Sequence, residues 1–271
     1  MLNSACRVPF TLLKMLESSR LAYHRRCLRE WQQRFGRWRG AELWLSLQIQ
    51  RMCRLDRHAS LSLPGVPARV HLRATGSDIA CFEQIFIRRE LGFDSPPQID
   101  LIIDAGANIG LATVVLANRF PDATVVALEV DSQNFRMLQM NTSDYPRVIA
   151  LNKALWHADG FVKIENPSAA AWSFKVLETT ADDPDAIPAV TVGSILRMVG
   201  RESVGLLKID IEGAEFEMFS NAQSWLHTVQ MLAVEIHEGI RPGVTALFES
   251  KIRAASRSCA RHGEYEVLRF I

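Results

Sequence analysis

The sequence predicts an α/β fold: a doubly wound, mostly parallel sheet that follows a basic helical N-terminal extension. Two features of residues 61–271 indicate the sheet. Short continuous apolar runs alternate with amphipathic segments, and several of the runs end in a polar residue. The extension, residues 1–60, has apolar residues at helical spacing. It also holds 12 Lys and Arg against 4 Asp and Glu, a net charge of +8 that contrasts with −7 for the rest of the chain.

Length and composition exclude several classes of protein. The 271 residues suit one large domain with an extension, and the 48% hydrophobic and 23% charged residues are close to globular averages. No apolar run approaches the roughly 18 residues of a membrane-spanning helix, and the first residues lack the pattern of a secretory leader. The five cysteines form no Cys-x-x-Cys pair. This argues against a disulfide framework or a cysteine zinc site, and it predicts a reducing, cytoplasmic location.

Residues 1–60 are predicted to form helices with one apolar stripe. Gly36 and Gly40 predict a break before a second apolar stretch at 41–55. Most arginines lie off the stripe, which leaves three roles open. These are a helical cap or homodimer face with a solvated basic side, a peripheral contact with an anionic membrane, and a grip on nucleic acid, for which no known binding motif is present. The stripe comprises Leu12, Leu16, Tyr23, Cys27, Trp31, Phe35 and Trp38.

The first half of the body is predicted to alternate strands and helices. Apolar runs bounded by turn residues predict strands, and apolar residues at steps of three and four predict helices. A Ser-Pro-Pro loop, a glycine loop and a Pro-Asp turn separate the elements, and Asp131 or Ser132 supplies a helix N-cap. In chain order we expect a strand at 66–73, a helix at 79–91, a strand at 100–104, a helix at 109–119, a strand at 124–129, a helix from 132 to about 140, and a strand at 148–151.

The second half of the body continues the pattern with shorter elements. Two short strands, at 160–165 and 189–192, flank a loop rich in Pro and Asp at 182–188. Longer apolar runs then return, separated by segments of helical periodicity. We expect a strand at 204–210, a helix at 213–226, a strand at 229–237, a helix near 243–261 and a final strand at 264–271.

Polar side chains end four of the predicted strands. Asp104, Glu129 and Asp210 each close an apolar run, and Glu235 and His237 close another, where their spacing of two places them on one face. Parallel sheets of this kind bind ligands beyond the carboxyl ends of their strands. One or two such acids could serve only as helix caps. Four polar strand ends at one edge predict a ligand site there.

The loop after the strand at 100–104 reads Asp-Ala-Gly-Ala-Asn-Ile-Gly. Gly106 and Gly110 allow positive φ angles and close approach of a ligand, and the next helix offers free N–H groups. A carboxylate at Glu129 can accept both hydroxyls of a ribose, which suits an adenosine cofactor. The dinucleotide pattern is absent because Asn108 occupies a position where it needs glycine, and no phosphate-binding P-loop occurs. These features favour S-adenosylmethionine, which has no phosphates, over NAD or ATP.

Five ordered segments resemble the FkbM-type S-adenosylmethionine-dependent methyltransferase family. LLKIDIEGAEFEMF (206–219) resembles the family signature K-x-D-x-E-G-x-E, and LAVEIHE (232–238) the strand after it. The others are residues 70–91, 102–117 and 127–141; Val130 departs from the family, which more often has proline there. The resemblance implies a Rossmann-like class I methyltransferase domain over 61–271, with an antiparallel last strand. It also implies methyl transfer to a hydroxyl of a glycan, glycolipid or other small natural product.

The resemblance also implies roles for individual residues. The glycine-loop residues would line the methionine part of the cofactor, Glu129 its ribose, and Asn152 and Ala154 its adenine. The implied cofactor-binding set is Asp104, Gly106, Asn108, Gly110, Glu129, Asn152, Ala154 and Asp210. The implied catalytic set is His237, Asp210, Glu212 and Glu235.

Methyl transfer to an alcohol needs in-line positioning and the loss of a proton. His237, with an ordinary pKa of about 6.5, is one candidate for the base. A divalent metal held by Asp210, Glu212 and His237 is the alternative, since it would lower the pKa of the alcohol. Lys208 lies inside a predicted strand, where a buried charge needs a partner such as Glu212 or Glu235.

Three other functions stay open. An RNA methyltransferase would use the basic extension to hold phosphates, although the chain has no Asn-Pro-Pro-aromatic or cysteine-based catalytic motif. A non-catalytic scaffold would keep the fold without its chemistry, against which the intact strand-end acids argue. An NAD-dependent oxidoreductase is disfavoured by Asn108. Binding of S-adenosylhomocysteine, of NAD or of neither separates these classes.

Overall fold

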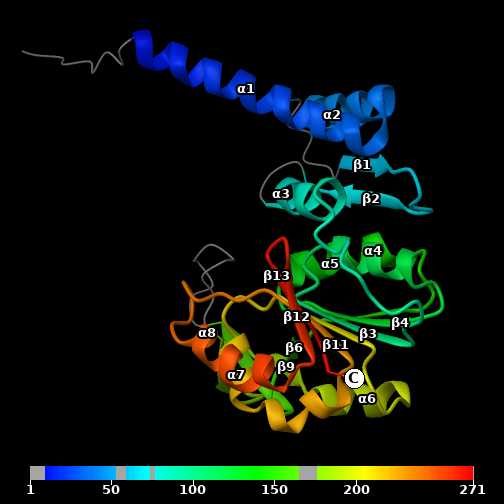
Figure 1. Ribbon diagram of the computed structural model, residues 1–271, viewed down its shortest axis with the longest axis vertical. Helices are drawn as coiled ribbons and strands as arrows, with labels where there is room; N and C mark the ends of the chain where they lie inside the picture. Colours follow the sequence, from blue (N-terminus) through cyan, green and yellow to red (C-terminus); the bar gives the residue numbers. More distant parts are fainter. Residues whose placement is uncertain (1–9, 53–58, 74–76, 165–175, 271) are drawn as a thin grey trace, which may run out of the picture.

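The computed structural model describes residues 10–52, 59–73, 77–164 and 176–270; the side chains of 10–21, 50–52 and 176 lie outside the description. Leu12 and Leu16 of the expected stripe therefore have no described side chains. The chain is built around a seven-stranded sheet, with helices on both of its faces and a helical extension stacked at one end (Figure 1).

The sheet has the strand order β12-β13-β11-β10-β3-β4-β5. Adjacent strands from β5 to β11 are parallel, whereas β13 runs antiparallel to β11, so the expected antiparallel last strand is confirmed. The strands β3, β10 and β11 are completely buried, because helices cover both of their faces. The bounds are β3 Leu101–Ala105, β4 Thr124–Leu128, β5 Val148–Leu151, β10 Leu206–Ile209, β11 Met231–Val234, β12 Ser258–His262 and β13 Tyr265–Arg269.

Alternate side chains of each central strand enter two separate cores. In β3, Ile102 packs in one core and Leu101 and Ile103 in the other, as the two-residue period of a strand requires. The first core is covered by α3 (Asp78–Phe82), a following π-helical turn (Glu83–Ile87), α4 (Leu111–Arg119) and α5 (Ser132–Thr142). The second is covered by α6 (Val192–Val199), α7 (Glu215–Ser220), α8 (Val244–Leu247) and the π-helical turn Phe248–Ile252.

The extension forms two helices, α1 (Phe10–Phe35) and α2 (Arg37–Met52), that break at Gly36 as predicted. A two-stranded hairpin, β1 (Ala59–Ser62) with β2 (Arg69–Leu72), and α3 lie between these helices and the sheet (Figure 1). Trp31 is fully buried and stacks on Phe82, with ring centroids 5.0 Å apart. The extension is therefore a helical cap whose core is continuous with the first core of the sheet.

The apolar stripe of the extension is only partly buried. Cys27 and Trp31 are buried, but Tyr23 is 45% exposed and Trp38 is 82% exposed. The expected boundary at residue 60 falls inside β1, so the division into 1–60 and 61–271 stays a prediction.

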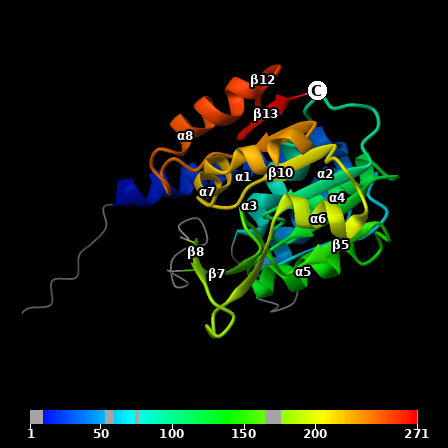
Figure 2. The same cartoon turned by 90° about the horizontal axis from the view of Figure 1, so that it is seen from below.

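A second, four-stranded sheet of order β6-β9-β7-β8 lies between β5 and α6 in the chain. Its strands β7 and β8 lie at the periphery of the molecule (Figure 2). Two of its strands, β6 and β8, were not expected from the sequence; β6 has only two residues. The bounds are β6 Ala154–Leu155, β7 Gly160–Ile164, β8 Val176–Thr179 and β9 Ile187–Val190.

The prediction of a helix near 243–261 is wrong for its C-terminal part. Residues 253–255 form a single 3-10 turn, and β12 follows at 258–262 as the partner of β13. The helix expected at 213–226 is also shorter, since α7 ends at Ser220 and two 3-10 turns, Ala222–Ser224 and Leu226–Thr228, complete the segment.

Candidate active site

A cavity of about 370 Å³ opens at the carboxyl ends of β3, β4 and β10. The loops after these strands form one wall, and the four-stranded sheet supplies the opposite, more apolar wall. Four acidic residues but a single lysine lie among the lining residues, which gives the cavity a negative charge. The lining residues are Ser77, Gly106, Asn108, Leu128, Glu129, Val130, Asp131, Asn134, Lys153, Ala154, Leu155, Trp156, Ile164, Asp210, Ile211, Glu212 and Ala214.

Gly106 brings the glycine loop against the end of β10. Its φ is +75°, and a Cβ added there would lie 1.7 Å from the backbone oxygen of Asp210. Only glycine fits this approach. Gly110 is also left-handed, with φ +86°, but it does not line the cavity. A Cβ there would lie 2.8 Å from Leu138, so Gly110 allows the loop to pack on α5.

Asn108 and Glu129 meet inside the cavity. The backbone N–H of Asn108 donates to Glu129 Oε2 over 2.7 Å, and the N–H of Asp131 donates to Oε1 over 2.8 Å. Burial raises the pKa of Glu129 to about 7, although these two donors favour the charged form. The Asn108 side-chain oxygen is buried and has no hydrogen-bond partner among the described residues. Both groups are thus available to a ligand.

Asn152 and Ala154 follow the third strand, as expected, but take different positions. Ala154 is buried and lines the cavity. Asn152 lies outside the lining, and its side-chain amide donates to the backbone oxygens of Glu129, over 2.7 Å, and of Val130. Asn152 therefore supports the turn that carries Glu129.

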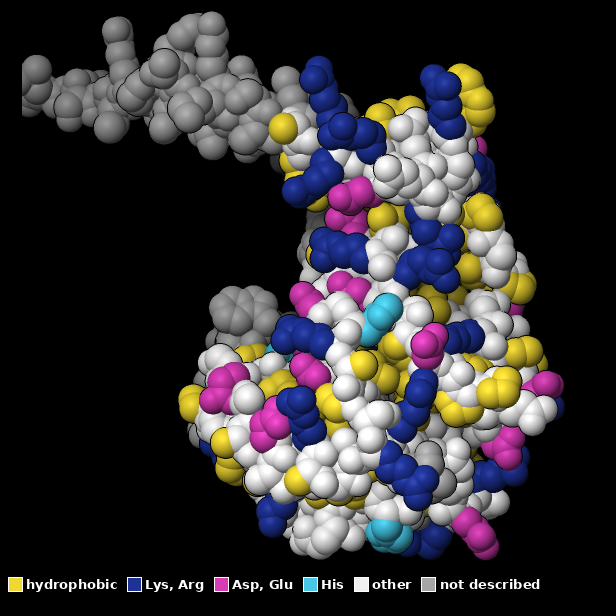
Figure 3. All heavy atoms as spheres, in the orientation of Figure 1, with side chains coloured by type: hydrophobic (Ala, Val, Ile, Leu, Met, Phe, Trp, Pro, Cys, Tyr) yellow, Lys and Arg dark blue, Asp and Glu magenta, His cyan; other side chains and the backbone are white. Residues whose placement is uncertain are grey.

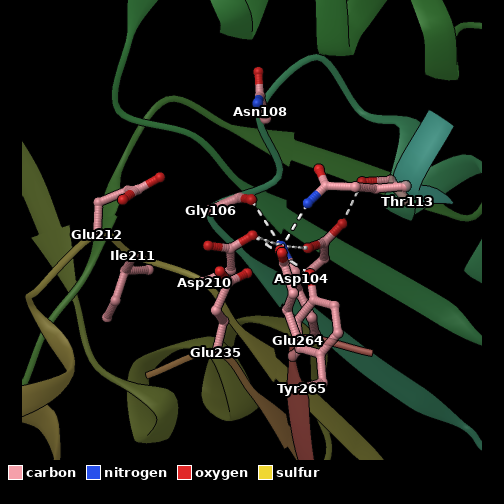
Figure 4. Close-up of polar contacts among 12 residues, drawn as sticks. Asp104, Gly106, Asn108, Thr113, Asp210, Ile211, Glu212, Glu235, Glu264 and Tyr265 are labelled. Carbon is pink, nitrogen blue, oxygen red and sulfur yellow. Dashed lines mark hydrogen bonds and ion pairs between the residues drawn. The ribbon is translucent and has the colours of Figure 1, made fainter. Parts of the chain in front are cut away.

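Asp104 lies beneath the cavity rather than on its wall. It is fully buried, accepts a hydrogen bond from Thr113 over 2.6 Å, and pairs with Lys208 over 3.2 Å. Lys208 occupies the facing position on β10, and it also contacts the Gly106 carbonyl, at 2.8 Å, and Asp210, at 3.4 Å. In Figure 4 the carboxylates of Asp104 and Asp210 and the Gly106 carbonyl converge on one point, while Glu212 stands apart.

The expected partners of Lys208 are therefore wrong. Glu212 and Glu235 do not pair with it; Asp104 and Asp210 do. Burial alone would lower the pKa of Lys208, but the charges of Asp104, Tyr265 and Asp210 together raise it well above its usual range. The side chain stays cationic, and it ties the glycine loop to the end of β10.

His237 lies in a ring of carboxylates. Its Nδ1 is 2.8 Å from Glu215 Oε1, and its Nε2 is 3.5 Å from Glu212 Oε2 and from Glu235 Oε1 and 3.8 Å from Asp210 Oδ1. The structure thus brings the four expected catalytic residues together. The cluster lies at one end of the cavity, where Asp210 and Glu212 are lining residues.

The ordinary pKa expected for His237 is wrong. Burial would lower that pKa, but hydrogen bonds to Glu215 and Glu235 outweigh it and raise the value to about 11. Burial also raises the pKa of Glu212 to about 7, and that of Glu235 above its usual range. In this arrangement, without a metal, the imidazole therefore favours its protonated form near neutral pH.

Glu215 is one of the site residues that the sequence analysis missed. It is fully buried, and its Oε1 accepts the Ile211 backbone N–H over 3.2 Å in addition to contacting His237. The available signal was its place as the last acid of the K-x-D-x-E-G-x-E segment. Glu212 has φ +52° and precedes Gly213, at φ +95°, so a left-handed turn directs Glu212 and Glu215 to the same histidine.

Comparisons with known proteins show similarity to methyltransferases. A family model described as Methyltransferase FkbM domain matches residues 104–259. The chain is 28% identical over 162 residues to the hexuronic acid methyltransferase AglP of Haloferax volcanii, covering 59% of this chain and 64% of that protein. It is 25% identical over 214 residues to the methyltransferase sdnD of Sordaria araneosa, covering 63% of this chain and 80% of that protein.

Among solved structures, an rRNA methylase from Streptococcus thermophilus aligns with a TM-score of 0.41 and 12% identity, over 67% of this chain and 92% of that one. The match to AglP spans less than two thirds of that protein's length. The family model covers more than half of the present chain, and its span includes the glycine loop, Glu129 and the His237 cluster. The chain therefore belongs to the FkbM methyltransferase domain family.

Proposed function

We propose that the chain is an S-adenosylmethionine-dependent O-methyltransferase that acts on a hydroxyl of a glycan, glycolipid or other small natural product. The observation that carries this proposal is the negatively charged cavity at the carboxyl ends of β3, β4 and β10, the edge at which such sheets bind ligands. The acceptor class is supported by family membership and by two relatives, of which one is named a hexuronic acid methyltransferase.

The cavity suits a cationic adenosine cofactor. S-adenosylmethionine carries a positive sulfonium and an ammonium group, which match a wall with four acids and one lysine. The unpartnered Asn108 oxygen would accept the ammonium, and the Glu129 carboxylate would accept the ribose hydroxyls. The wall at Ala154 would contact the adenine. In this proposal Asp104, Gly110 and Asn152 do not contact the cofactor; they hold the loops that line the cavity.

The proposed reaction moves the methyl group from sulfur to a hydroxyl oxygen. The C–O bond forms as the S–C bond breaks, which leaves S-adenosylhomocysteine and a proton from the hydroxyl. Positioning supplies much of the rate, because the sulfonium is already an activated donor. We assign proton removal to the cluster of Asp210, Glu212, Glu235 and His237, with His237 acting otherwise than as a free neutral base.

Calorimetric titration of the full chain with S-adenosylhomocysteine tests cofactor binding. We expect one site per chain and at least tenfold weaker binding by Glu129→Ala, because hydrogen bonds to a charged group contribute about 1.5–3 kcal/mol each. Glu202→Ala, an exposed change remote from the cavity lining, should bind as the wild type does. Binding of NAD in place of S-adenosylhomocysteine, or of neither, would overturn the proposal.

Labelled cofactor then tests the acceptor. The full chain, incubated with isotopically labelled S-adenosylmethionine and separated glycan, lipid and RNA extracts, should label a hydroxyl in the glycan, lipid or small-molecule fractions. Transfer only to RNA would instead support an RNA methyltransferase. Tight binding of S-adenosylhomocysteine without transfer to any fraction would contradict the enzymatic proposal and support a scaffold.

We further propose that the extension contacts an anionic membrane, which would place a cytoplasmic enzyme at the membrane periphery. Trp38, Leu45 and Ile49 of α2 are 82%, 50% and 58% exposed, and their spacing puts them on one side of the helix. Figure 3 shows Lys and Arg side chains over the helices at the top of the view, with apolar side chains among them. No helix in the described ranges has both the length and the hydropathy to cross a membrane.

Sedimentation with vesicles tests the membrane contact. Vesicles containing phosphatidylserine should bind the full chain in low salt and release it in high salt, because basic residues each contribute about 1 kcal/mol near such a surface. Replacing Trp38, Leu45 and Ile49 by serine should abolish binding, whereas Met198→Ser, an exposed apolar change on α6, should not. No binding by the wild type, or a dimer that the triple variant dissolves, would contradict the proposal.

A further inference from the structure

We propose that Asp210, Glu212 and His237 bind a divalent metal ion beside the cavity. The role given to this ion in catalysis rests on the proposed function, but its binding does not. One oxygen from each carboxylate and Nε2 of the imidazole all lie within 4.8 Å of one another. They come from two loops, one after β10 and one after β11, which meet at the same edge of the sheet.

The distances are close to those of a metal site. His237 Nε2 lies 3.5 Å from Glu212 Oε2 and 3.8 Å from Asp210 Oδ1. Divalent metals bind nitrogen and oxygen at roughly 2.0–2.2 Å, so two ligands of one ion lie at most about 4.4 Å apart. A small rotation of the half-buried Glu212 side chain completes the arrangement.

Glu215 orients the imidazole of His237. In many metal sites a carboxylate orients the histidine ligand in this way, by contacting the ring nitrogen that does not bind the metal. It faces Nδ1 of His237 at 2.8 Å, and therefore leaves Nε2 directed at Asp210, Glu212 and Glu235. Metal-binding histidines commonly donate their second ring N–H to such a carboxylate. An ion at Nε2 would displace the proton that the imidazole carries there without metal, so binding would release one proton. Glu215 is completely buried, and its Oε2 has no hydrogen-bond partner among the described residues. We assign it as a positioning residue.

Carboxylates outnumber the cationic side chains of the cluster. Four carboxylates, those of Asp210, Glu212, Glu215 and Glu235, surround His237. The nearby cation Lys208 is already held by Asp104 and the Gly106 carbonyl as well as by Asp210. Glu212 Oε2 is buried and has no hydrogen-bond donor among the described residues. His237 is the cation nearest to this oxygen, at 3.5 Å, and a divalent ion bound between them would give Glu212 a direct ligand contact and favour its charged form.

The three ligand atoms, one imidazole nitrogen and two carboxylate oxygens, favour some divalent metals over others. Imidazole nitrogen suits first-row transition ions, while carboxylates suit Mn²⁺, Mg²⁺ and Ca²⁺. A site with one imidazole and two carboxylates therefore fits Mn²⁺ better than Mg²⁺ or Ca²⁺. In the proposed reaction the ion would bind the acceptor hydroxyl and lower its pKa. The proton would pass to Glu235, and the alkoxide oxygen would take the methyl group as the S–C bond breaks.

Titration of the metal-free full chain with Mn²⁺ tests the site, with free Mn²⁺ followed by electron paramagnetic resonance. We expect one Mn²⁺ per chain, and much weaker binding of Mg²⁺ and Ca²⁺ in competition. Glu212→Gln and His237→Gln should each weaken Mn²⁺ binding at least tenfold. Glu215→Gln should weaken it by about 10–100-fold, as the loss of such a supporting carboxylate does. Glu238→Gln, an exposed neighbour of His237 outside the cluster, should bind normally.

The controls keep this test separate from the proposed function. Circular dichroism melts verify the folding of each variant. If His237→Gln does not fold, the test rests on Glu212→Gln, because Glu212 is half-exposed and its replacement should not affect folding. Binding of S-adenosylhomocysteine is measured without metal, so a failure of cofactor binding and a failure of metal binding are distinct results. No Mn²⁺ binding by the wild type, or equal binding by folded Glu212→Gln, would overturn the metal site.

Discussion

If Glu129 holds the cofactor ribose as proposed, we expect cofactor binding to depend on pH. Burial raises its pKa to about 7, so the carboxyl is half protonated near neutral pH. A ribose would bind the charged form, which has acceptors for both hydroxyls. Affinity for S-adenosylhomocysteine should therefore rise as the pH increases from about 6 to about 8, by up to about tenfold, and level off above that. Calorimetric titrations across this range measure the effect.

Glu129→Gln is the matched variant for this pH dependence, since it keeps the shape of the side chain and cannot ionise. Its affinity should be lower at about pH 8 and nearly constant over the range. A wild-type affinity that does not change with pH would show that Glu129 does not titrate where a ligand binds.

Gly106→Ala should disrupt the site and the fold together. The new Cβ would overlap the backbone oxygen of Asp210, at 1.7 Å, and the left-handed φ of +75° adds strain. Gly65→Ala is the control, because Gly65 has a similar φ of +76° with nothing within 4 Å of a Cβ. We expect Gly65→Ala to cost about 1 kcal/mol of unfolding free energy and Gly106→Ala several times more in urea denaturation. Equal costs would refute the close approach as the reason for glycine.

Sequence patterns indicated the acids at the strand ends but not the contacts that they make. The acids at the strand ends were predictable, because an apolar run that stops at an acid shows in the sequence. The pairing of Lys208 with Asp104 was not, because it depends on the register of β10 against β3, which places the two residues side by side. The contact between Glu215 and His237 joins α7 to the loop after β11, so no local spacing could show it.

At the scale of elements, the crossing of α1 and α2 depends on Gly40. A Cβ at Gly40 would lie 2.3 Å from the Trp31 backbone oxygen, so alanine would push the helices apart. Gly193→Ala in α6 is the matched control, because a Cβ there meets only ordinary contacts at 3.6 Å and beyond. Helix propensity alone favours alanine at both positions by about 1 kcal/mol. We expect a higher melting temperature for Gly193→Ala and a lower one for Gly40→Ala.

Elements with buried apolar runs were predictable and short peripheral ones were not. The runs that became β3, β4, β10 and β11 are continuous because both faces of the sheet are covered there. The apolar run of β5 was also visible in the sequence, although this edge strand is only half-buried or exposed. The strand β12 has the burial of an edge strand, with its residues half-buried or exposed. Its sequence therefore lacks an apolar run. For this reason the helix predicted near 243–261 was wrongly continued through the residues of β12. The pairing with β13 decides its structure.

At the scale of the whole molecule, the extension and the sheet share a core and should unfold together. Trp31→Ala removes a fully buried ring that stacks on Phe82, which should cost about 3–5 kcal/mol. Trp38→Ala removes a ring that is 82% exposed and should change stability by less than about 0.5 kcal/mol. Urea unfolding followed by circular dichroism should show one transition for both variants. Early loss of helix alone in Trp31→Ala would indicate an independent extension.

The four-stranded sheet forms one wall of the cavity independently of the seven-stranded sheet. It occupies a single stretch of chain between β5 and α6, and it shares no strand with the seven-stranded sheet. Yet Ala154, Trp156 and Ile164, in and around it, form part of the cavity wall. Insertions or deletions within this stretch would change that wall of the cavity, because the strand ends that carry Glu129 and His237 belong to the other sheet. The shape of the cavity can therefore change without any change in the seven-stranded sheet.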